Sequence, residues 1–251
     1  MTIGSIAKSF GPSAQPGQFP VGEVAQTGVR CHHRAMTDKI PTPPGADNQP
    51  PFDSASDVFF GAVDRAIAFA GPRLARDSFS KVSRHVMRLL EDAVTAFRSG
   101  SFGTAVFLAV TSMEEVAKAE MSIYRRGPAD PEVRLRADPL FNHKAKHVIS
   151  VRPTTFMGRL REILGEDACK RLQEDAQGGE LIRLREAALY STLGADETTT
   201  PDEIIDHEKA RETLLLALEV ADDVLVGYNS ETFMMGELIS AWMVEVAAFA
   251  P

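Results

Sequence analysis

The sequence predicts an all-α protein built as a helical bundle, and three observations support this. Apolar residues recur at spacings of three and four along most of the chain after residue 51, as they do on one face of a helix. No segment shows the apolar–polar alternation of a strand. The link Gly100-Ser101-Phe102 joins two predicted helices, and so short a link makes them antiparallel neighbours. The 251 residues, 44% hydrophobic and 25% charged, suffice for one good-sized helical domain.

The N-terminal part of the chain lacks the signals of a packed structure. Residues 1–51 are rich in proline and show no sustained periodicity, so we expect a disordered tail. Met36 would serve as a start of translation as well as Met1. Helical spacing begins just after this tail and ends at Gly71-Pro72, which predicts an accessory helix within residues 52–79.

The main helical domain is expected over residues 80–228. It opens with a helical hairpin whose first helix starts near Ser80 and ends at Ser99-Gly100, with glycine in the usual position after a C-terminus. The second helix of the hairpin is expected at about residues 103–125. Further helical segments are expected at residues 154–164, 181–190 and 204–227. A last amphipathic helix, within residues 229–251, has an apolar face that packs either on the domain or on a second chain.

The second helix of the hairpin carries charges inside an apolar stretch. Residues 105–110 are all apolar, and Glu114, Glu115 and Lys118 follow after Thr111-Ser112-Met113. Ionised side chains removed from water cost several kcal/mol each unless they are paired or hydrogen-bonded. The structural explanation is an ion pair within the helix, because Lys118 stands four residues from Glu114 and three from Glu115. The functional explanation is that these acids hold the basic segment that follows.

The basic segment is confined to a short part of an otherwise acidic protein. Net charge is −8, but residues 125–152 contain seven Lys/Arg and only three Asp/Glu, and they include the cluster His143-Lys144-Ala145-Lys146-His147. From residue 153 onward, twenty acidic residues face eight basic ones. Because affinity for a phosphate backbone grows with the number of phosphates neutralised, a confined basic loop holds one or two phosphates but not a long track of nucleic acid.

Several other classes of protein are excluded by what the sequence lacks. No apolar run reaches 18 residues and the N-terminus has no secretory signal, so we expect a cytoplasmic protein without a membrane partner. Cys31 and Cys169 are far apart and are read as free thiols. No histidines and acids are spaced as metal ligands, and no glycine-rich phosphate loop or nucleophile elbow occurs. We therefore expect no metal and no other cofactor.

A set of short motifs, in order, carries a resemblance to a known family. The motifs are Leu89-Leu90-Glu91-Asp92-Ala93, Gly100-Ser101-Phe102-Gly103-Thr104-Ala105, Glu114-Glu115-Val116-Ala117-Lys118, Phe141-Asn142-His143-Lys144-Ala145-Lys146, Leu184-Arg185-Glu186-Ala187-Ala188-Leu189-Tyr190 and a helix led by Pro201. Over about residues 80–226 the chain resembles the AbiV abortive-infection family, which belongs to the HEPN superfamily of helical bundles. The resemblance implies a HEPN-like bundle, with the tail and the terminal helices as additions.

The resemblance also implies a function. It suggests a bacterial anti-phage factor and, for HEPN bundles more broadly, a metal-independent endoribonuclease that works as a homodimer with its active cleft between protomers. The superfamily signature is an arginine, four to six residues, then a histidine, and Arg136 and His143 match that spacing. Asp138-Pro139 between them argues against one continuous helix. In this reading His143 transfers protons and Arg136 stabilises charge on the scissile phosphate.

Supporting roles follow for the rest of the charged set. Lys144 and Lys146 would bind flanking phosphates of RNA, while Glu114, Glu115 and Lys118 would orient the basic loop against the bundle. A second interpretation stays open, in which the protein is a non-catalytic binding module. The same ions then brace the bundle, and the protein arrests translation or captures a partner protein. The expected partners are RNA, an activating phage protein and a second copy of the chain.

Overall fold

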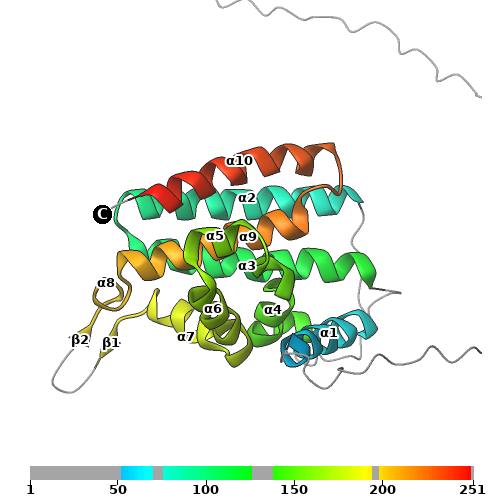
Figure 1. Cartoon of the computed structure of the whole chain (residues 1–251), viewed down its shortest axis with the longest axis horizontal. Helices are drawn as coiled ribbons and strands as arrows, with labels where there is room; N and C mark the ends of the chain where they lie inside the picture. The colour runs from blue at the N-terminus through cyan, green and yellow to red at the C-terminus, as the bar shows by residue number, and fades with distance from the viewer. Residues whose placement is uncertain (1–51, 70–75, 126–137, 194–197, 250–251) are drawn as a thin grey trace, which may run out of the picture. The chain divides into compact units, whose positions relative to one another are not determined.

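The computed structural model describes residues 52–69, 76–125, 138–193 and 198–249, and within them the chain is a helical bundle (Figure 1). The predicted tail, residues 1–51, lies outside the described residues. The α-helices are α1 (Phe52–Ala68), α2 (Arg76–Arg98), α3 (Phe102–Tyr124), α4 (His143–Ser150), α5 (Arg159–Leu164), α6 (Glu166–Gly178), α7 (Glu180–Ala187), α8 (Pro201–Ile204), α9 (His207–Leu225) and α10 (Ser230–Ala248). The short 3-10 helices are η3 (Pro139–Phe141) and η4 (Pro153–Phe156). The predicted all-α fold class is confirmed.

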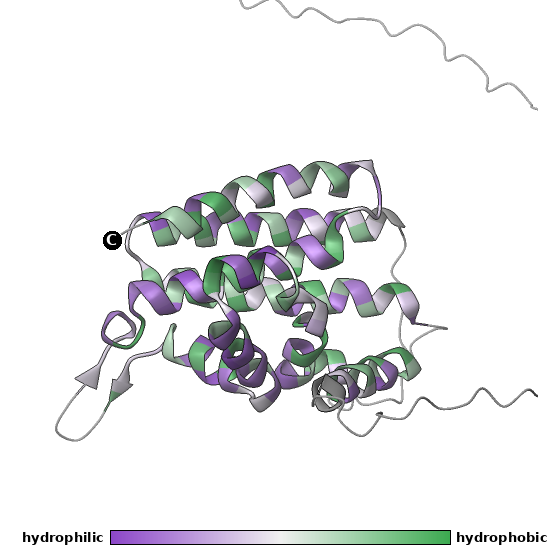
Figure 2. Cartoon of the chain, in the orientation of Figure 1, coloured by the Kyte–Doolittle hydropathy of each residue, from purple (hydrophilic) through white to green (hydrophobic). Residues whose placement is uncertain are grey.

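Helices α2, α3 and α9 form the centre of the bundle. The predicted α2–α3 hairpin is present, and its turn uses Gly100 at φ 78°, a conformation that glycine adopts without strain. Phe97, Leu90, Met113 and Leu214 are among its fully buried side chains. The long helices carry both hydrophobic and hydrophilic residues, as their partly buried positions require (Figure 2).

Helix α3 separates two groups of helices. It packs against α2 and α9 on one side, and against α4 and α7 on the other, with α1 and α6 next to α4 (Figure 1). Between these contacts a row of α3 residues stays partly exposed, and Thr104, Phe107, Thr111 and Lys118 belong to it. Of the charged residues of α3, Glu114 faces α4 and α7.

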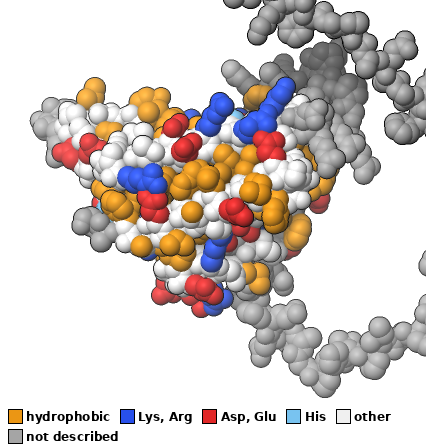
Figure 3. Space-filling model, turned by 90° about the horizontal axis from the view of Figure 1, so that it is seen from above, with side chains coloured by type: hydrophobic (Ala, Val, Ile, Leu, Met, Phe, Trp, Pro, Cys, Tyr) orange, Lys and Arg blue, Asp and Glu red, His pale blue; other side chains and the backbone are white. Residues whose placement is uncertain are grey.

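Helix α10 is apolar on more than one side. Ile239, Met243 and Val246 are buried against the bundle, where α10 contacts α2 and α9. Its outward side exposes four large apolar side chains. They are Phe233, Met234, Leu238 and Val244, exposed by 62%, 59%, 46% and 71%. Seen from the α10 side, hydrophobic side chains gather across the middle of the surface (Figure 3).

Two local predictions were wrong. The expectation that no strand occurs fails at β1 (Thr192–Leu193) and β2 (Thr198–Thr199), which pair antiparallel. With two residues each, these strands are too short for any alternation to show in the sequence. Residues 154–164 do not form one helix, because η4 ends at Phe156 and α5 starts only after Gly158. In the described parts of the chain, no helix has both the length and the apolar character needed to cross a membrane.

Candidate functional site

The basic cluster lies on a helix, and the prediction of a loop there was wrong. The side chain of Asn142 accepts a hydrogen bond from the backbone N–H of Ala145 at 3.0 Å and so caps the start of α4. His143 is therefore the first residue of α4. Just upstream, the Asp138 side chain caps η3 by accepting from the Leu140 N–H at 2.8 Å. Two successive capping residues, Asp138 and Asn142, thus fix the starts of η3 and of α4, the helix that contains the basic residues.

The helical conformation places three cationic or titratable residues on one face. His143, Lys146 and His147 are spaced by three and four, and all three reach Glu114 of α3. His143 Nδ1 lies 2.8 Å from Glu114 Oε1, and the Lys146 ammonium donates to Glu114 Oε2. His147 Nε2 lies 3.3 Å from Glu114 Oε1, without the geometry of a hydrogen bond. One carboxylate therefore binds the whole inner face of α4.

The members of this cluster differ sharply in exposure. The side chains of Glu114, Lys146 and His147 are 5%, 4% and 0% exposed, whereas that of His143 is 43% exposed. Glu114 and Lys146 thus form a buried ion pair, and His143 carries the cluster to the surface. Because its Nδ1 faces a carboxylate, the neutral His143 ring keeps its proton on Nδ1 and leaves Nε2 free to accept one.

The pKa directions agree with this arrangement. Burial by itself raises the pKa of Glu114, but the close contact with His147, the hydrogen bond from Lys146 and the charge of Lys146 outweigh it, so the pKa lies well below the usual range. Burial lowers the pKa of His147, with the charge of Glu114 acting in the opposite direction. Burial likewise lowers the pKa of Lys146 against the pull of Glu114. At neutral pH the cluster therefore contains an ionised Glu114 and an uncharged His147.

Sequence reasoning missed Arg185 of α7. Its Nε lies 3.9 Å from Glu114 Oε1, and its guanidinium lies 5.3 Å from the centre of the Phe107 ring, a cation–π contact. The side chain is 26% exposed, so the charge borders the surface next to His143. Arg185 stands inside the motif Leu184–Tyr190, but no spacing in the sequence relates that motif to Glu114.

The remaining predicted residues divide between the cluster and its surroundings. Lys118 pairs with Glu115, and both side chains are partly exposed, at 39% and 24%. The intrahelical ion pair thus accounts for these two residues, while Glu114 is used elsewhere. Lys144 is exposed on the outer side of α4. Arg136 lies outside the described residues.

A second buried ion pair was also missed. Arg125 donates to Asp138 through Nη1 at 2.7 Å and through Nη2, and its Nε donates to the Ala66 carbonyl of α1 at 3.1 Å. Both side chains are almost fully buried, at 4% and 6% exposed. The pair joins the two residues that flank the segment 126–137, in which Arg136 stands. Sequence reasoning had counted Arg125 only in the local positive charge of residues 125–152.

The geometry suits proton transfer beside an anion. An oriented and partly exposed imidazole, His143, lies among the cations Arg185 and Lys144 on one side of the bundle. Within the residues that the structure covers, no group of three or more His, Cys, Asp or Glu side chains is arranged to hold a metal ion.

The comparison with protein families agrees with the motifs. The HEPN-type family model described as AbiV matches residues 74–222, more than half of the chain. The chain belongs to the AbiV family. The AbiV match includes Glu114, His143 and Arg185, and it leaves α1 and the whole of α10 outside. The resemblance predicted from the motifs is confirmed, and the bundle is of the HEPN type. Comparisons with curated proteins and with solved structures give no significant match.

Proposed function

We propose that this AbiV-family protein is a metal-independent endoribonuclease that acts on cellular or phage RNA in anti-phage defence, in the cytoplasm. The observation that carries the proposal is the 2.8 Å contact between Glu114 Oε1 and His143 Nδ1. It holds a partly exposed imidazole in one tautomer, at the edge of a cluster of cations. A general base needs this placement, with one ring nitrogen anchored and the other directed to the substrate.

The proposed reaction uses the ribose itself as nucleophile. His143 Nε2 accepts the proton of the 2′-hydroxyl while the 2′-oxygen attacks the adjacent phosphorus. The bond from phosphorus to the 5′-oxygen breaks, and a protonated histidine donates a proton to that oxygen. The products are a 2′,3′-cyclic phosphate and a 5′-hydroxyl end. Positive charge near the phosphate stabilises the transition state. Arg185 supplies such charge among the described residues, and Arg136 is the arginine that the family signature assigns to this role.

The supporting roles follow from burial. Lys144 is exposed and is proposed to contact a flanking phosphate of the RNA. Lys146 is 3% exposed, so we give it a different role from the phosphate contact expected from the sequence: it fixes Glu114, which in turn fixes His143. Glu115 and Lys118 brace α3 beside this cluster.

We also propose that the protein acts as a homodimer and that a phage protein activates it. The exposed apolar side of α10 supports the dimer, because its four large apolar side chains form a surface that association would cover (Figure 3). Leu238 lies near the middle of α10 and Val244 toward its C-terminal end. An antiparallel pair of α10 helices about a twofold axis would bring the same residues together from both chains.

A non-catalytic binding module is the second candidate function, and one observation favours it. Lys146 and His147 are buried, so much of the cluster is occupied in holding α4 to α3. The ion cluster then braces the bundle, and the protein arrests translation or captures a partner protein through another surface. This reading gives the exposed His143 no chemical role, and that difference is testable.

The two candidates are separated by His143→Ala in the full-length chain. The matched control is His85→Ala, which removes an exposed histidine of α2 that is not among the partners of Glu114. Under the ribonuclease proposal, His143→Ala protein leaves total RNA intact and loses anti-phage protection, while His85→Ala behaves as the parent does. Arg136→Ala tests the second signature residue in the same way. If His143→Ala and the parent leave RNA equally intact, or His143→Ala protects fully, the enzyme proposal fails.

A further inference from the structure

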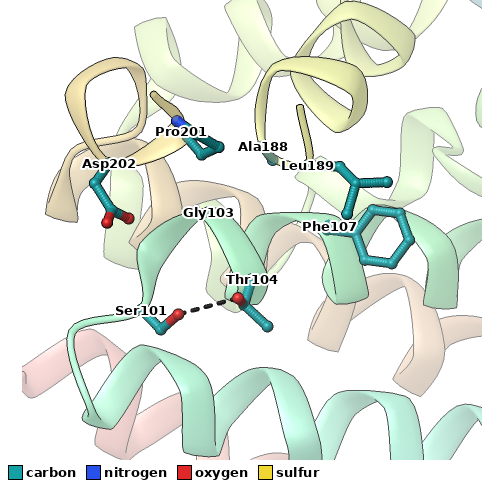
Figure 4. A pocket seen from close by; sticks show the side chains of 8 residues that line it. All are labelled: Ser101, Gly103, Thr104, Phe107, Ala188, Leu189, Pro201 and Asp202. Atoms are coloured by element: carbon teal, nitrogen blue, oxygen red, sulfur yellow. Dashed lines mark hydrogen bonds between the residues drawn. The ribbon is translucent and has the colours of Figure 1, made fainter. Parts of the chain in front are cut away.

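A pocket of about 290 Å³ lies beside the candidate site, where the start of α3 meets the end of α7 and the start of α8 (Figure 4). Its walls combine the apolar side chains of Phe107, Leu189 and Pro201 with the polar groups of Ser101, Thr104 and Asp202. Small-molecule sites likewise combine apolar walls with polar groups that fix orientation; this pocket is more polar than most of them, and its volume lies just below their usual range.

The pocket and the ionic cluster share one wall. Phe107 lines the pocket, and the guanidinium of Arg185 lies over the Phe107 ring. The Nε atom of Arg185 lies 3.9 Å from Glu114 Oε1. Phe107 and Glu114 stand seven residues apart on α3, a separation of about 10 Å along the helix axis. A partly exposed row of α3 connects them through Thr111. An RNA strand with a phosphate at His143 therefore passes within reach of the pocket.

The floor of the pocket includes a glycine, Gly103, at which three helical segments pack closely. A Cβ at Gly103 would lie 3.0 Å from the Ala188 carbonyl oxygen and 3.0 Å from Pro201 Cβ, so α7, α8 and α3 approach here as closely as a bare backbone allows. Figure 4 shows Asp202 on one side of Gly103, with Phe107 and Leu189 on the other. A flat ligand across Gly103 would have apolar contacts at one end and a carboxylate at the other.

We propose that this pocket binds one nucleobase of the RNA and sets a preference for guanine, an inference that rests on the proposed ribonuclease function. Single-stranded RNA offers unstacked bases with free Watson–Crick edges, which proteins bind by aromatic and apolar contact together with hydrogen bonds. Guanine presents two adjacent N–H donors on that edge, and these match the two acceptor oxygens of Asp202. The Ser101 hydroxyl donates to Thr104 Oγ1 at 3.0 Å, which leaves the Thr104 O–H as a donor and both hydroxyl oxygens as acceptors toward the same base.

The test is a binding measurement that does not need cleavage. Two fluorescent hexanucleotides with 2′-O-methyl riboses, which cannot react, are compared by anisotropy: all uridine, and uridine with one central guanosine. The full-length parent should bind the guanosine oligonucleotide about tenfold more tightly, the discrimination of one good bidentate contact. Asp202→Asn should remove that preference, because it replaces one acceptor by a donor. Leu189→Trp, at a side chain that is 44% exposed, should fill the pocket and also remove it.

The control is Asp92→Asn, which alters an exposed carboxylate of α2 outside the pocket and should keep the preference. Equal affinity of the parent for both oligonucleotides, an unchanged preference in Asp202→Asn, or no binding of either would overturn the pocket proposal. The His143→Ala cleavage assay is independent of these outcomes. Cleavage that depends on His143, found without a guanine preference, would support the ribonuclease proposal and refute the pocket proposal. A guanine preference found without cleavage would support only the pocket proposal.

Discussion

The candidate site depends on the carboxylate of Glu114. Glu114→Gln tests how much that carboxylate contributes to the free energy of unfolding. Glutamine keeps the size and the hydrogen-bonding oxygen but removes the charge. It leaves the Lys146 ammonium 4% exposed with no ionised partner in the contacts seen here. Breaking a buried ion pair from one side costs about 3–5 kcal/mol. Because glutamine still accepts hydrogen bonds, we expect the lower end, a loss of about 3 kcal/mol in the free energy of unfolding.

A double-mutant cycle isolates the pair from everything else that Glu114 contacts. Lys146→Met alone leaves the Glu114 charge buried beside His143 and His147, and should cost about 2–3 kcal/mol. The double variant contains neither buried charge, so its loss should be smaller than the two single losses added, by about 2 kcal/mol or more. Urea unfolding followed by circular dichroism at neutral pH measures all four proteins. Additive losses, or less than about 1 kcal/mol for Glu114→Gln, would show that this pair does not hold α4 to α3.

The same cluster predicts how stability depends on pH. The pKa of Glu114 is lower in the folded protein than its ordinary value of 4.5, so its stabilising contribution is complete above that pH and is lost as the pH falls below it. The pKa of His147 is also lowered, from 6.5, so protonation of the unfolded chain weakens folding as the pH falls below that value. The parent should therefore lose stability in two stages on acidification. In Glu114→Gln the stage below pH 4.5 should be smaller, and identical acid profiles would contradict this.

Three further predictions concern the rest of the bundle. Arg125→Met leaves the carboxylate of its buried partner unpaired and should cost about 3 kcal/mol by urea unfolding, whereas Arg98→Met, at an exposed pair, should cost under about 1 kcal/mol; equal losses would argue against the buried pair. Leu238→Glu combined with Val244→Glu should turn a dimer into a monomer by light scattering without lowering the urea midpoint, and a parent that is monomeric at every concentration would refute the α10 interface. Gly103→Ala should cost about 1–3 kcal/mol, since its methyl group meets a backbone carbonyl at 3.0 Å, and a urea midpoint equal to the parent's would contradict that contact.

The long helices were predictable because their apolar spacing is strong and their ends are marked. Gly100 ends α2, and the short link after it sets the antiparallel hairpin, so both could be read directly. The start of α2 was placed at Ser80, whereas the helix begins at Arg76, because the residues before Phe79 carry few apolar signals. Short elements were less accessible. Residues 143–150 form a helix of only two turns, and its clearest signal is the single capping residue Asn142.

The candidate site was predictable only in part. A buried carboxylate that follows an apolar run requires a cationic or hydrogen-bonding partner, and in the structure Glu114 contacts His143 and Lys146. Its neighbour Glu115 instead pairs within α3, and sequence spacing does not distinguish the two acids. Which acid turns inward depends on how α4 packs on α3. Arg185 was not predicted for the same reason. Its proximity to Glu114 depends on how α7 packs on α3, and no local sequence pattern indicates it.

The buried contact between Arg125 and Asp138 has a consequence for how this protein can vary. It ties together the two ends of residues 126–137, so the bundle on either side is fixed whatever lies between. Once the ends are tied, doubling the length of the tract between them adds only about 0.6 kcal/mol of closure entropy. Insertions, deletions and exchanges in that tract should therefore be tolerated thermodynamically. Apart from Arg136, which the family signature assigns to catalysis, this stretch of the chain can then change in length and sequence without loss of the fold.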